Sequence, residues 1–323
     1  MTAIAHRTTA QAGLRPIDLR RDLGAIARLI EICFGDQLDA GGRSAIREKL
    51  VLSRYGPLLG MMGSVLQYTP GWSLGFVWIE AGRMVGNVGV QPAASRRQSW
   101  LIANVAVHPE YRRRGIARSL VHAAVDMAAA RGGEEVLLQV EADNAGALRL
   151  YDSLGFETLT TRTVWELRTR QVPDLASSPR KDIRLSSSSH WQAEFDLLSE
   201  ERPEGLEWTQ PLDARRFRPS FTRTIGNFMN GKREEHWIAG PQDQVHGWMR
   251  LKMTFGRLDH ISLVIRSSLR EELERPMLVR ALRRLGRRPW AVRIEHPAEL
   301  SQELFKALQF RPLRTLRWMR LRL

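Results

Sequence analysis

The apolar positions between residues 101 and 156 follow two periods in turn. A short apolar run at 101–107 predicts a buried strand. Residues 116–128 then place apolar side chains at three- and four-residue spacing, which is the period of an amphipathic helix. A second apolar run at 136–140 predicts another strand, and residues 144–154 predict a second helix. The pattern therefore predicts a βαβ unit followed by a further helix.

The remainder of residues 13–168 extends this unit. We predict further elements as follows: strands at 14–19, 72–80, 85–91, 158–161 and 164–167, and helices at 22–34 and 43–55. The apolar segment 58–66 contains Met61 and Met62. A packed helix is the simpler interpretation of it, and an adaptable lid over a ligand is the alternative, because methionine side chains fit varied shapes.

The second half of the chain repeats the same order of elements. We predict strands at 182–185, 235–239, 245–253, 258–265 and 290–295, and helices at 190–200, 269–285 and 298–308. Residues 169–181 contain prolines and serines with little apolar content, which indicates a linker. The sequence therefore predicts two tandem copies of one fold, a first copy at 13–168 and a second copy at 182–323.

A basic loop stands between the strand ending at Val107 and the helix that follows. It reads Arg112-Arg113-Arg114-Gly115-Ile116-Ala117. Backbone N–H groups at a helix start have no partner within the helix, and Gly115 lets a ligand approach them closely, so the loop is suited to phosphate. The alternative is an arginine-rich turn on the surface. The spacing matches neither a nucleoside triphosphate loop nor a dinucleotide fingerprint.

Three linked motifs here resemble the GCN5-related N-acetyltransferases, the GNAT family. Arg112–Ala117 matches the family's acetyl-CoA loop, [QR]-x-x-G-x-[GA], and 105–111 is similar to its strand-and-turn lead-in. Residues 144–156 are similar to its N-x-x-A-x-x-L-Y-x-x-x-G-F helix. The resemblance covers about half of the chain. It implies an α/β (α+β) fold of mixed, mostly antiparallel sheets flanked by helices, with acetyl-CoA as cosubstrate and direct attack by a primary amine.

The resemblance also implies roles for individual residues. Those expected to bind acetyl-CoA are Asn104, Val105, Ala106, Val107, Arg112, Arg113, Arg114, Gly115, Ile116, Ala117 and Asn144. The strand residues would pair with the pantetheine arm, and a backbone N–H near Val105 or Ala106 would stabilise an oxyanion. Tyr151 would be the general acid, since a phenol is protonated at neutral pH. The alternatives are that Tyr151 only packs the helix and that Asn144 only caps it.

The general base is less defined. In ribosomal-protein alanine acetyltransferases, which this stretch also resembles, a glutamate on the strand before the asparagine serves, but Gln139 stands at the matching position. Glu141 lies two residues on, so it points to the same face of the strand and could act directly or through water. A surface carboxylate with no role and a chain of waters without a dedicated base are the alternatives.

The second copy keeps the pattern of elements but not the chemistry. The segment that corresponds to the loop contains no glycine and carries Glu271 and Glu272, which would repel phosphate. Phe305 is the aromatic residue nearest to the position of Tyr151. We therefore predict a degenerate second copy that shapes the acceptor cleft or mediates self-association.

Composition limits the remaining function classes. The 323 residues carry a net charge of +14, which could indicate a nucleic-acid partner, but no nucleic-acid module signature accompanies it and we do not expect one. Cys33 is the only cysteine and the histidines lack ligand spacing, so we expect no metal. No apolar run reaches the length of a membrane span, which predicts a cytoplasmic protein without a membrane partner.

Three functions follow as hypotheses. The first is acetyl transfer from acetyl-CoA to the amine of a small molecule. The second is acetylation of a protein or peptide amine, and the third is a regulator that binds acetyl-CoA without turnover. Residues 20–70, where we expect acceptor specificity to lie, match no diagnostic pattern.

Overall fold

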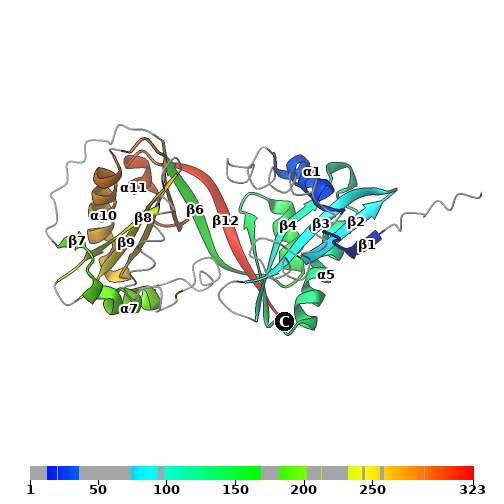
Figure 1. Cartoon of the computed structure of the whole chain (residues 1–323), viewed down its shortest axis with the longest axis horizontal. Coiled ribbons are helices and arrows are strands. Elements are labelled where there is room, and N and C mark those ends of the chain that lie inside the picture. The colour runs from blue at the N-terminus through cyan, green and yellow to red at the C-terminus, as the bar shows by residue number, and fades with distance from the viewer. Residues whose placement is uncertain are drawn as a thin grey trace, which may run out of the picture. The chain divides into compact units, whose positions relative to one another are not determined.

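The structure is a computed structural model of the whole chain (Figure 1). It describes the following residues: 13–19, 21–35, 74–93, 98–168, 182–201, 212, 232–241, 244–254, 258–286 and 288–323. The predicted helices at 43–55 and 58–66 and the predicted linker at 169–181 lie outside the described residues.

The first copy alternates strands and helices in the predicted order. Its elements are β1 (Gly13–Pro16), α1 (Leu23–Phe34), β2 (Leu74–Glu80), β3 (Arg83–Pro92), β4 (Ser99–Val107), the 3₁₀ turn η2 (Pro109–Tyr111), α5 (Ile116–Ala130), β5 (Glu135–Glu141), α6 (Ala145–Ser153) and β6 (Glu157–Leu167). The two expected strands at the end of this copy form one continuous strand, β6.

The second copy follows the same order. Its elements are β7 (Ile183–Leu185), the 3₁₀ turn η3 (Ser188–His190), α7 (Trp191–Glu201), β8 (Lys232–Ala239), β9 (Gly247–Thr254), β10 (Asp259–Ile265), the 3₁₀ turn η4 (Ser267–Leu269), α10 (Arg270–Leu285), β11 (Val292–Pro297), α11 (Gln302–Ala307) and β12 (Arg311–Arg322). The predicted order of strand, helix, three strands, helix, strand and helix is confirmed in the second copy, and β12 adds a last strand that was not predicted.

The described chain forms two compact units that interleave along the sequence. Unit 1 comprises Met1–Leu138, Leu150–Glu157 and Arg320–Leu323, and unit 2 comprises Gln139–Arg149 and Thr158–Met319. The units therefore do not coincide with the two copies. The domain limits 13–168 and 182–323 stay a prediction drawn from sequence.

Unit 1 is built on the strands β1, β2, β3, β4 and β5, in that spatial order. The first four pair antiparallel, and β5 runs parallel to β4. Ile26, Ala27 and Ile30 of α1 pack against Val77 of β2 on one face. The helix α5 covers the other face at Gly86 of β3, where an added Cβ would lie 2.9 Å from Ile116 and Leu120, so glycine lets this helix approach the sheet closely.

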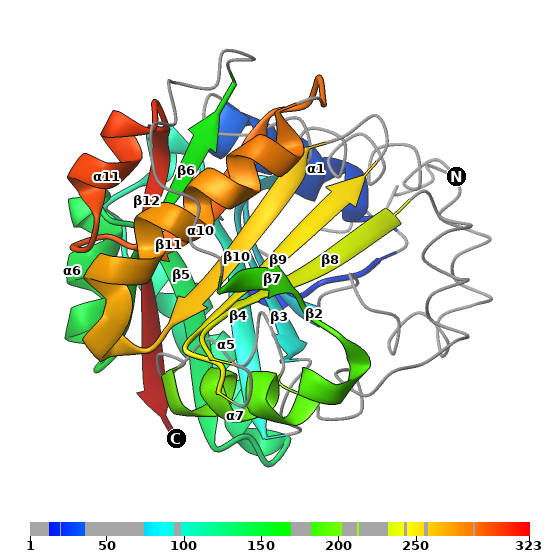
Figure 2. The same ribbon diagram turned by 90° about the vertical axis from the view of Figure 1, so that its left-hand side faces the viewer.

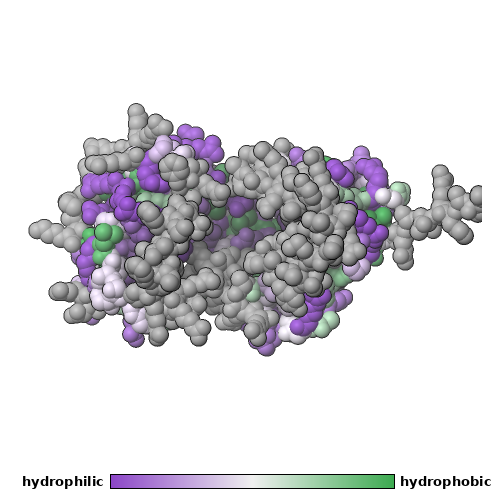
Figure 3. Space-filling view, viewed as in Figure 1, coloured by the Kyte–Doolittle hydropathy of each residue, from purple (hydrophilic) through white to green (hydrophobic). Residues whose placement is uncertain are grey.

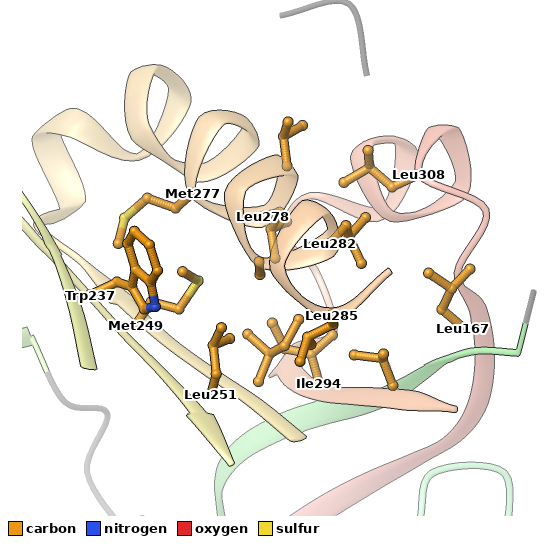
Figure 4. Close-up of a cluster of buried hydrophobic side chains, with 14 of the residues drawn as sticks. Leu167, Trp237, Met249, Leu251, Met277, Leu278, Leu282, Leu285, Ile294 and Leu308 are labelled. Atoms are coloured by element: carbon orange, nitrogen blue, oxygen red, sulfur yellow. The ribbon is translucent and has the colours of Figure 1, made fainter. Parts of the chain in front are cut away.

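Unit 2 has the spatial order β6, β11, β10, β9, β8, β7. Figure 2 shows α10 crossing in front of these strands. Its buried side chains form the main core with β8, β9 and β11: Met277 lies beside Trp237 and Met249, and Leu285 beside Ile294 (Figure 4). Leu197 and Leu198 of α7 pack with Ile238, Trp248 and Val264, which alternate with the first set along the strands and so lie on the opposite face.

The last strands of the two copies change places. β6 follows α6 of the first copy, yet it pairs antiparallel with β11 of the second copy, from Val292↔Leu167 to Pro297↔Arg162. Trp165 of β6 stacks on Phe305, with ring centroids 5.1 Å apart. The C-terminal end of β12 lies beside the start of β5 instead, where the Leu323 N–H donates to the Glu134 carbonyl at 2.9 Å. The last strand of the first copy thus pairs within unit 2, and the last residues of the chain, Arg320–Leu323, belong to unit 1.

The described surface in Figure 3 is mostly hydrophilic, with small apolar patches between. The exposed large apolar side chains are scattered: Leu14, Ile32, Leu185, Leu300, Leu313 and Leu323. Within the described residues, no helix is long and apolar enough to cross a membrane.

Candidate acetyl-CoA site

Strand β4 is interrupted where the sequence predicts the cofactor strand. Its register with β3 runs Gly86↔Val107 and Asn87↔Ala106 and then shifts to Gly89↔Ala103, so Asn104 and Val105 both stand opposite Val88. Two residues opposite one define a β-bulge. Asn104 has a φ of 55°, a left-handed conformation that asparagine tolerates better than most residues.

The bulge lies beyond the end of the pairing between β4 and β5. That parallel ladder covers only Ser99–Leu101 against Glu135–Leu137. Val105 belongs to neither ladder. The strand therefore presents backbone groups of its second half to a ligand, as the pairing with a pantetheine arm requires.

The loop Arg112–Gly115 follows η2 and ends at the first turn of α5. Arg113 has a φ of 65° and Gly115, the N-cap of α5, has a φ of 79°. An added Cβ at Gly115 would meet no atom within 4 Å, so the space in front of the helix start is open. The first turn of α5 contains no acidic side chain, which keeps the positive end of the helix dipole unopposed. The loop fits an anionic group such as a pyrophosphate.

The three loop arginines have different surroundings. Arg112 donates from Nε to the Val107 carbonyl at 3.1 Å and so ties the loop to the end of β4. Arg114 forms an exposed ion pair with Glu80 at 3.1 Å and lies over the ring of Tyr111. Arg113 is exposed. Arg112 therefore also shapes the site, whereas Arg113 presents its charge to solvent.

Asn144 caps the helix α6. Its Oδ1 accepts the Ala147 N–H at 3.1 Å, and its side chain is exposed. This is the geometry of an N-cap, which satisfies one of the unpaired N–H groups at the helix start. The capping interpretation of Asn144 is confirmed, and its contact with a cofactor stays a prediction.

Tyr151 lies on the buried side of α6. Its side chain is 6% exposed and its ring meets Phe156 edge to face, with centroids 5.7 Å apart. A left-handed Gly155 ends the helix, and the Leu154 and Phe156 N–H groups both donate to the Tyr151 carbonyl at 3.0 Å. Burial raises the pKa of Tyr151 to about 12, so the phenol holds its proton throughout the neutral and mildly alkaline range.

Glu141 ends β5 and is half-buried. Burial raises the pKa of this carboxyl, the charge of Arg314 opposes the rise, and Asp143 adds to it. A raised pKa makes a carboxylate a stronger base. Glu141 and Asn144 belong to unit 2, whereas β4, the loop and Tyr151 belong to unit 1, so the structure groups the predicted residues in two sets.

The sequence patterns missed two polar residues beside β4. Asn87 of β3 is 2% exposed, and its Nδ2 donates to the Asn104 carbonyl at 3.0 Å. Cys33 of α1 donates to the Val107 carbonyl at 3.4 Å, and burial raises the pKa of its thiol. The sequence could have indicated Asn87, because it is the one polar side chain in the otherwise apolar run 85–90.

The second copy lacks these features at the corresponding places. The register of β10 on β9 is continuous from His260↔Lys252 to Ile265↔Gly247. Helix α10 begins at Arg270, immediately after η4, so the equivalent of the loop Arg112–Gly115 is missing altogether. Glu271 and Glu272 lie in the first turn of α10, as predicted. Carboxylates there disfavour an anion.

No group of three or more metal-ligand side chains occurs among the residues that the structure describes.

Comparisons with known proteins agree with this arrangement. A family model described as "Acetyltransferase (GNAT) family" matches residues 58–156. The [ribosomal protein bS18]-alanine N-acetyltransferase of Escherichia coli K12 is 44% identical over 59 residues, which are 18% of this chain and 40% of that protein. The mycothiol acetyltransferase of Kocuria rhizophila is 31% identical over 146 residues, 45% of each chain. The chain thus spans less than half of these relatives' length.

Two solved structures match nearly the whole chain. A GCN5-related N-acetyltransferase from Sphaerobacter thermophilus has a TM-score of 0.61 at 16% identity, and the matched region covers 96% of this chain and 95% of that protein's chain. A tandem GNAT protein from the clavulanic acid biosynthesis pathway has a TM-score of 0.55 at 16% identity, with 97% and 98% covered. At this identity the likeness concerns the fold. Residues 58–156 thus match the GNAT acetyltransferase family, and nearly the whole chain shares the fold of a tandem GNAT protein.

Proposed function

We propose that the protein is an N-acetyltransferase that transfers an acetyl group from acetyl-CoA to a primary amine, with a small molecule as the acceptor. The observation that carries this proposal is the combination in one unit of a bulged strand, an open helix start and a basic loop, joined by the 3.1 Å contact between Arg112 and Val107. Relatives that match this chain are named as N-acetyltransferases.

Acetyl-CoA supplies an activated acetyl group as a thioester. In this proposal the helix start at Gly115–Ala117 and the loop arginines hold its phosphates, and the free half of β4 orients its pantetheine arm. Charge-assisted hydrogen bonds from guanidinium groups are the stronger kind, and Arg113 presents such donors without reorganisation of the fold.

The reaction requires a neutral amine, because only an amine with a free electron pair attacks a carbonyl carbon. The amine nitrogen forms a bond to the acetyl carbon, the carbon–sulfur bond breaks, and its electron pair leaves on sulfur. Glu141 takes the proton from the amine, directly or through water, and its raised pKa favours that transfer. Tyr151 gives its proton to the thiolate, and because burial raises the pKa of the phenol to about 12, the phenol is protonated at neutral pH.

A protein or peptide amine is the second candidate acceptor. It is favoured by the 44% identity over 59 residues to an enzyme named [ribosomal protein bS18]-alanine N-acetyltransferase. The relative named mycothiol acetyltransferase favours a small molecule instead. The two candidates differ in the size of the acceptor and share all steps at the thioester.

The direct test is release of free CoA thiol from acetyl-CoA. The full chain is incubated with a panel of small primary amines and with peptides that carry a free N-terminus. We expect turnover with at least one small amine, and turnover that is slower by about 10²-fold with the Tyr151→Phe variant at equal concentration. Turnover with peptides alone would select the second candidate, and saturable acetyl-CoA binding without turnover on either panel would indicate a regulator.

A further inference from the structure

The buried amide of Asn87 is the strongest feature that the proposed reaction leaves unused. It lies on β3 directly opposite Ala106, in a run where every residue from Val85 to Val90 is buried. Its Nδ2 donates to the Asn104 carbonyl at 3.0 Å, and its Oδ1 is buried without a hydrogen-bond partner among the described residues. An unpartnered buried acceptor costs stability, so this side chain is a poor choice for packing alone.

The hydrogen bond fixes the direction of one peptide unit. The chain contains no cis peptide bond in its described part, so the Asn104 C=O and the Val105 N–H point in opposite directions. The Asn104 carbonyl points toward Asn87 on β3. The Val105 N–H therefore points away from the Asn87 side chain, at a residue that lies beyond the end of the ladder with β5 at Leu101↔Leu137.

The neighbouring residue cannot supply this donor. The His108 N–H donates to the Val85 carbonyl at 2.9 Å, which makes this a hydrogen-bonded pair of the antiparallel ladder. Such pairs recur at every second residue, so Ala106 and Asn87 form the next one and the Ala106 N–H faces β3. Of the two candidate oxyanion donors, Val105 is the one whose N–H is not used in the ladder with β3.

We propose that Asn87 is a positioning residue of the acetyl-transfer site. Its amide holds the strained, left-handed Asn104, and it thereby aims the Val105 N–H at the thioester oxygen on which negative charge develops. The hydrogen bond at the Asn104 carbonyl also polarises the shared peptide unit and strengthens the Val105 N–H as a donor. This inference rests on the proposed function, and it adds a residue to the site that neither touches the acceptor nor transfers a proton.

The test uses two substitutions of Asn87 in the full chain. Asn87→Leu keeps the branched shape and removes the donor, and Asn87→Asp keeps the shape and faces the carbonyl with an oxygen. Gln91→Leu is the matched control, because Gln91 lies on the same strand outside the bulge, opposite Leu101. Acetyl-CoA labelled with ¹³C at the carbonyl reports the polarisation of the thioester by infrared spectroscopy, and CoA, which has no such carbonyl, reports binding alone.

We expect the wild-type protein and Gln91→Leu to shift the bound carbonyl stretch to lower frequency. Both Asn87 variants should lose most of that shift and lower kcat by roughly tenfold to a hundredfold, because one preorganised donor has moved. Their affinity for CoA should be unchanged, and Asn87→Leu should unfold no earlier than the wild type.

Two results would overturn the inference while the proposed function stands. One is a wild-type shift and kcat in Asn87→Leu, which would make Asn87 a packing residue. The other is a loss of CoA affinity in both Asn87 variants, which would mean that they damage the site as a whole. A wild-type protein that binds no acetyl-CoA would overturn the proposed function and this inference together.

Discussion

The two copies use the same local devices to build the frame around the site. After β4 the His108 N–H donates to the Val85 carbonyl at 2.9 Å, and after β10 the Arg266 N–H donates to the His246 carbonyl at 2.8 Å. A 3₁₀ turn follows in each copy, η2 in the first and η4 in the second. These contacts set the direction in which the chain enters the next helix.

The ends of the last helices also agree in detail. In the first copy the Phe156 N–H donates to the Tyr151 carbonyl at 3.0 Å, and in the second the Phe310 N–H donates to the Phe305 carbonyl at 2.9 Å. Both pairs of rings meet edge to face, at 5.7 Å and 5.6 Å. Both ends pass through a left-handed residue, Gly155 and Gln309. The phenolic oxygen is the difference between the two aromatic positions.

The copies differ where a ligand would be held. The second copy lacks the bulge and the loop, and its fifth residue after the helix N-cap is Glu274, where the first copy has Leu120. The carboxylate of Glu274 lies 2.7 Å from Nε2 of His296, and both side chains are buried. Burial raises the pKa of the Glu274 carboxyl, but its hydrogen bonds with His296 and Ser301 and the nearby charge of Arg270 help to hold that pKa below its ordinary value. The second copy thus keeps the packing of the first copy without its bulge and its loop.

The largest expected effect concerns the loop. Arg112→Glu with Arg114→Glu should make the first copy resemble the second and weaken acetyl-CoA binding on the order of 10³-fold, because two charge-assisted contacts become repulsive. Isothermal titration calorimetry on the full chain measures this change, and the wild type should bind one acetyl-CoA per chain.

Two further variants separate the effect of charge within the loop from the effect of the net charge of the chain. Arg113→Glu leaves the contacts of Arg112 and Arg114 intact and should weaken binding by a smaller factor. Arg275→Glu with Arg311→Glu changes the net charge equally at exposed positions of the second copy and should leave the affinity within a factor of about two. An unchanged affinity in the loop double variant, or two sites per chain in the wild type, would contradict the comparison of the copies.

The next effect concerns the phenol that the second copy lacks. Tyr151→Phe reproduces the aromatic residue found at Phe305 and should lower kcat by about 10²-fold, with little change in acetyl-CoA affinity, because the hydroxyl matters only as the thiolate leaves. Steady-state kinetics and calorimetry measure the two quantities separately. A variant with full kcat at saturating substrates would leave Tyr151 as a packing residue, as Phe305 is.

The sequence was sufficient for the repeat and for the order of its elements, because both rest on the spacing of apolar residues along the chain. It could not show that β6 pairs with β11, since either copy offers a strand of suitable length and polarity, and pairing partners depend on tertiary contacts. For the same reason the prediction of two closing strands, at 158–161 and 164–167, was wrong, because one strand, β6, covers both ranges.

The site was predictable where a motif fixes the residue type and not where geometry does. The motif predicted a glycine at position 115, and the φ of 79° in the structure explains why a glycine is suited to that position. The bulge at Asn104 and the role of Asn87 depend on register, which a one-residue insertion changes without altering the apolar pattern. The missing loop of the second copy was predicted only as a change of residue types.

A smaller effect is expected at Glu141 and depends on pH. Its pKa is raised, and only the ionised form accepts a proton, so kcat/KM should rise with pH through a pKa above the ordinary value of this side chain. Glu141→Gln should abolish this rise, the acidic limb of the pH profile, and lower kcat/KM at neutral pH by at most about 10²-fold. Glu157→Gln, at an exposed position, is the control. A limb that persists in Glu141→Gln would assign the base role to water.

Activity in the alkaline range of the same pH profile tests the protonation state of the Tyr151 phenol. Because its pKa is raised to about 12, deprotonation of the acid should not reduce activity near pH 10, where a free phenol ionises. The wild-type kcat should therefore persist through pH 10, up to the pH at which the protein unfolds. A decline centred near pH 10 that is absent in Tyr151→Phe would show that the phenol is more solvated than the structure has it.

The smallest effect concerns the left-handed residue that ends each last helix. Gln309 has a φ of 63° and is exposed, so Gln309→Gly should relieve the strain of a side chain in this conformation at no loss of contacts. The relief is about 1–2 kcal/mol, and the greater freedom of glycine in the unfolded chain offsets about 0.5–1 kcal/mol of it, for a net stabilisation of about 0.5–1 kcal/mol. The mirrored change, Gly155→Gln, should destabilise by a similar amount, because an added Cβ would meet Leu321 only at 3.5 Å, an ordinary contact. Urea unfolding of both variants measures the pair. Opposite signs of similar size would show that the two helix ends are equivalent, whereas destabilisation by both would mean that Gln309 contributes something that Gly155 does not.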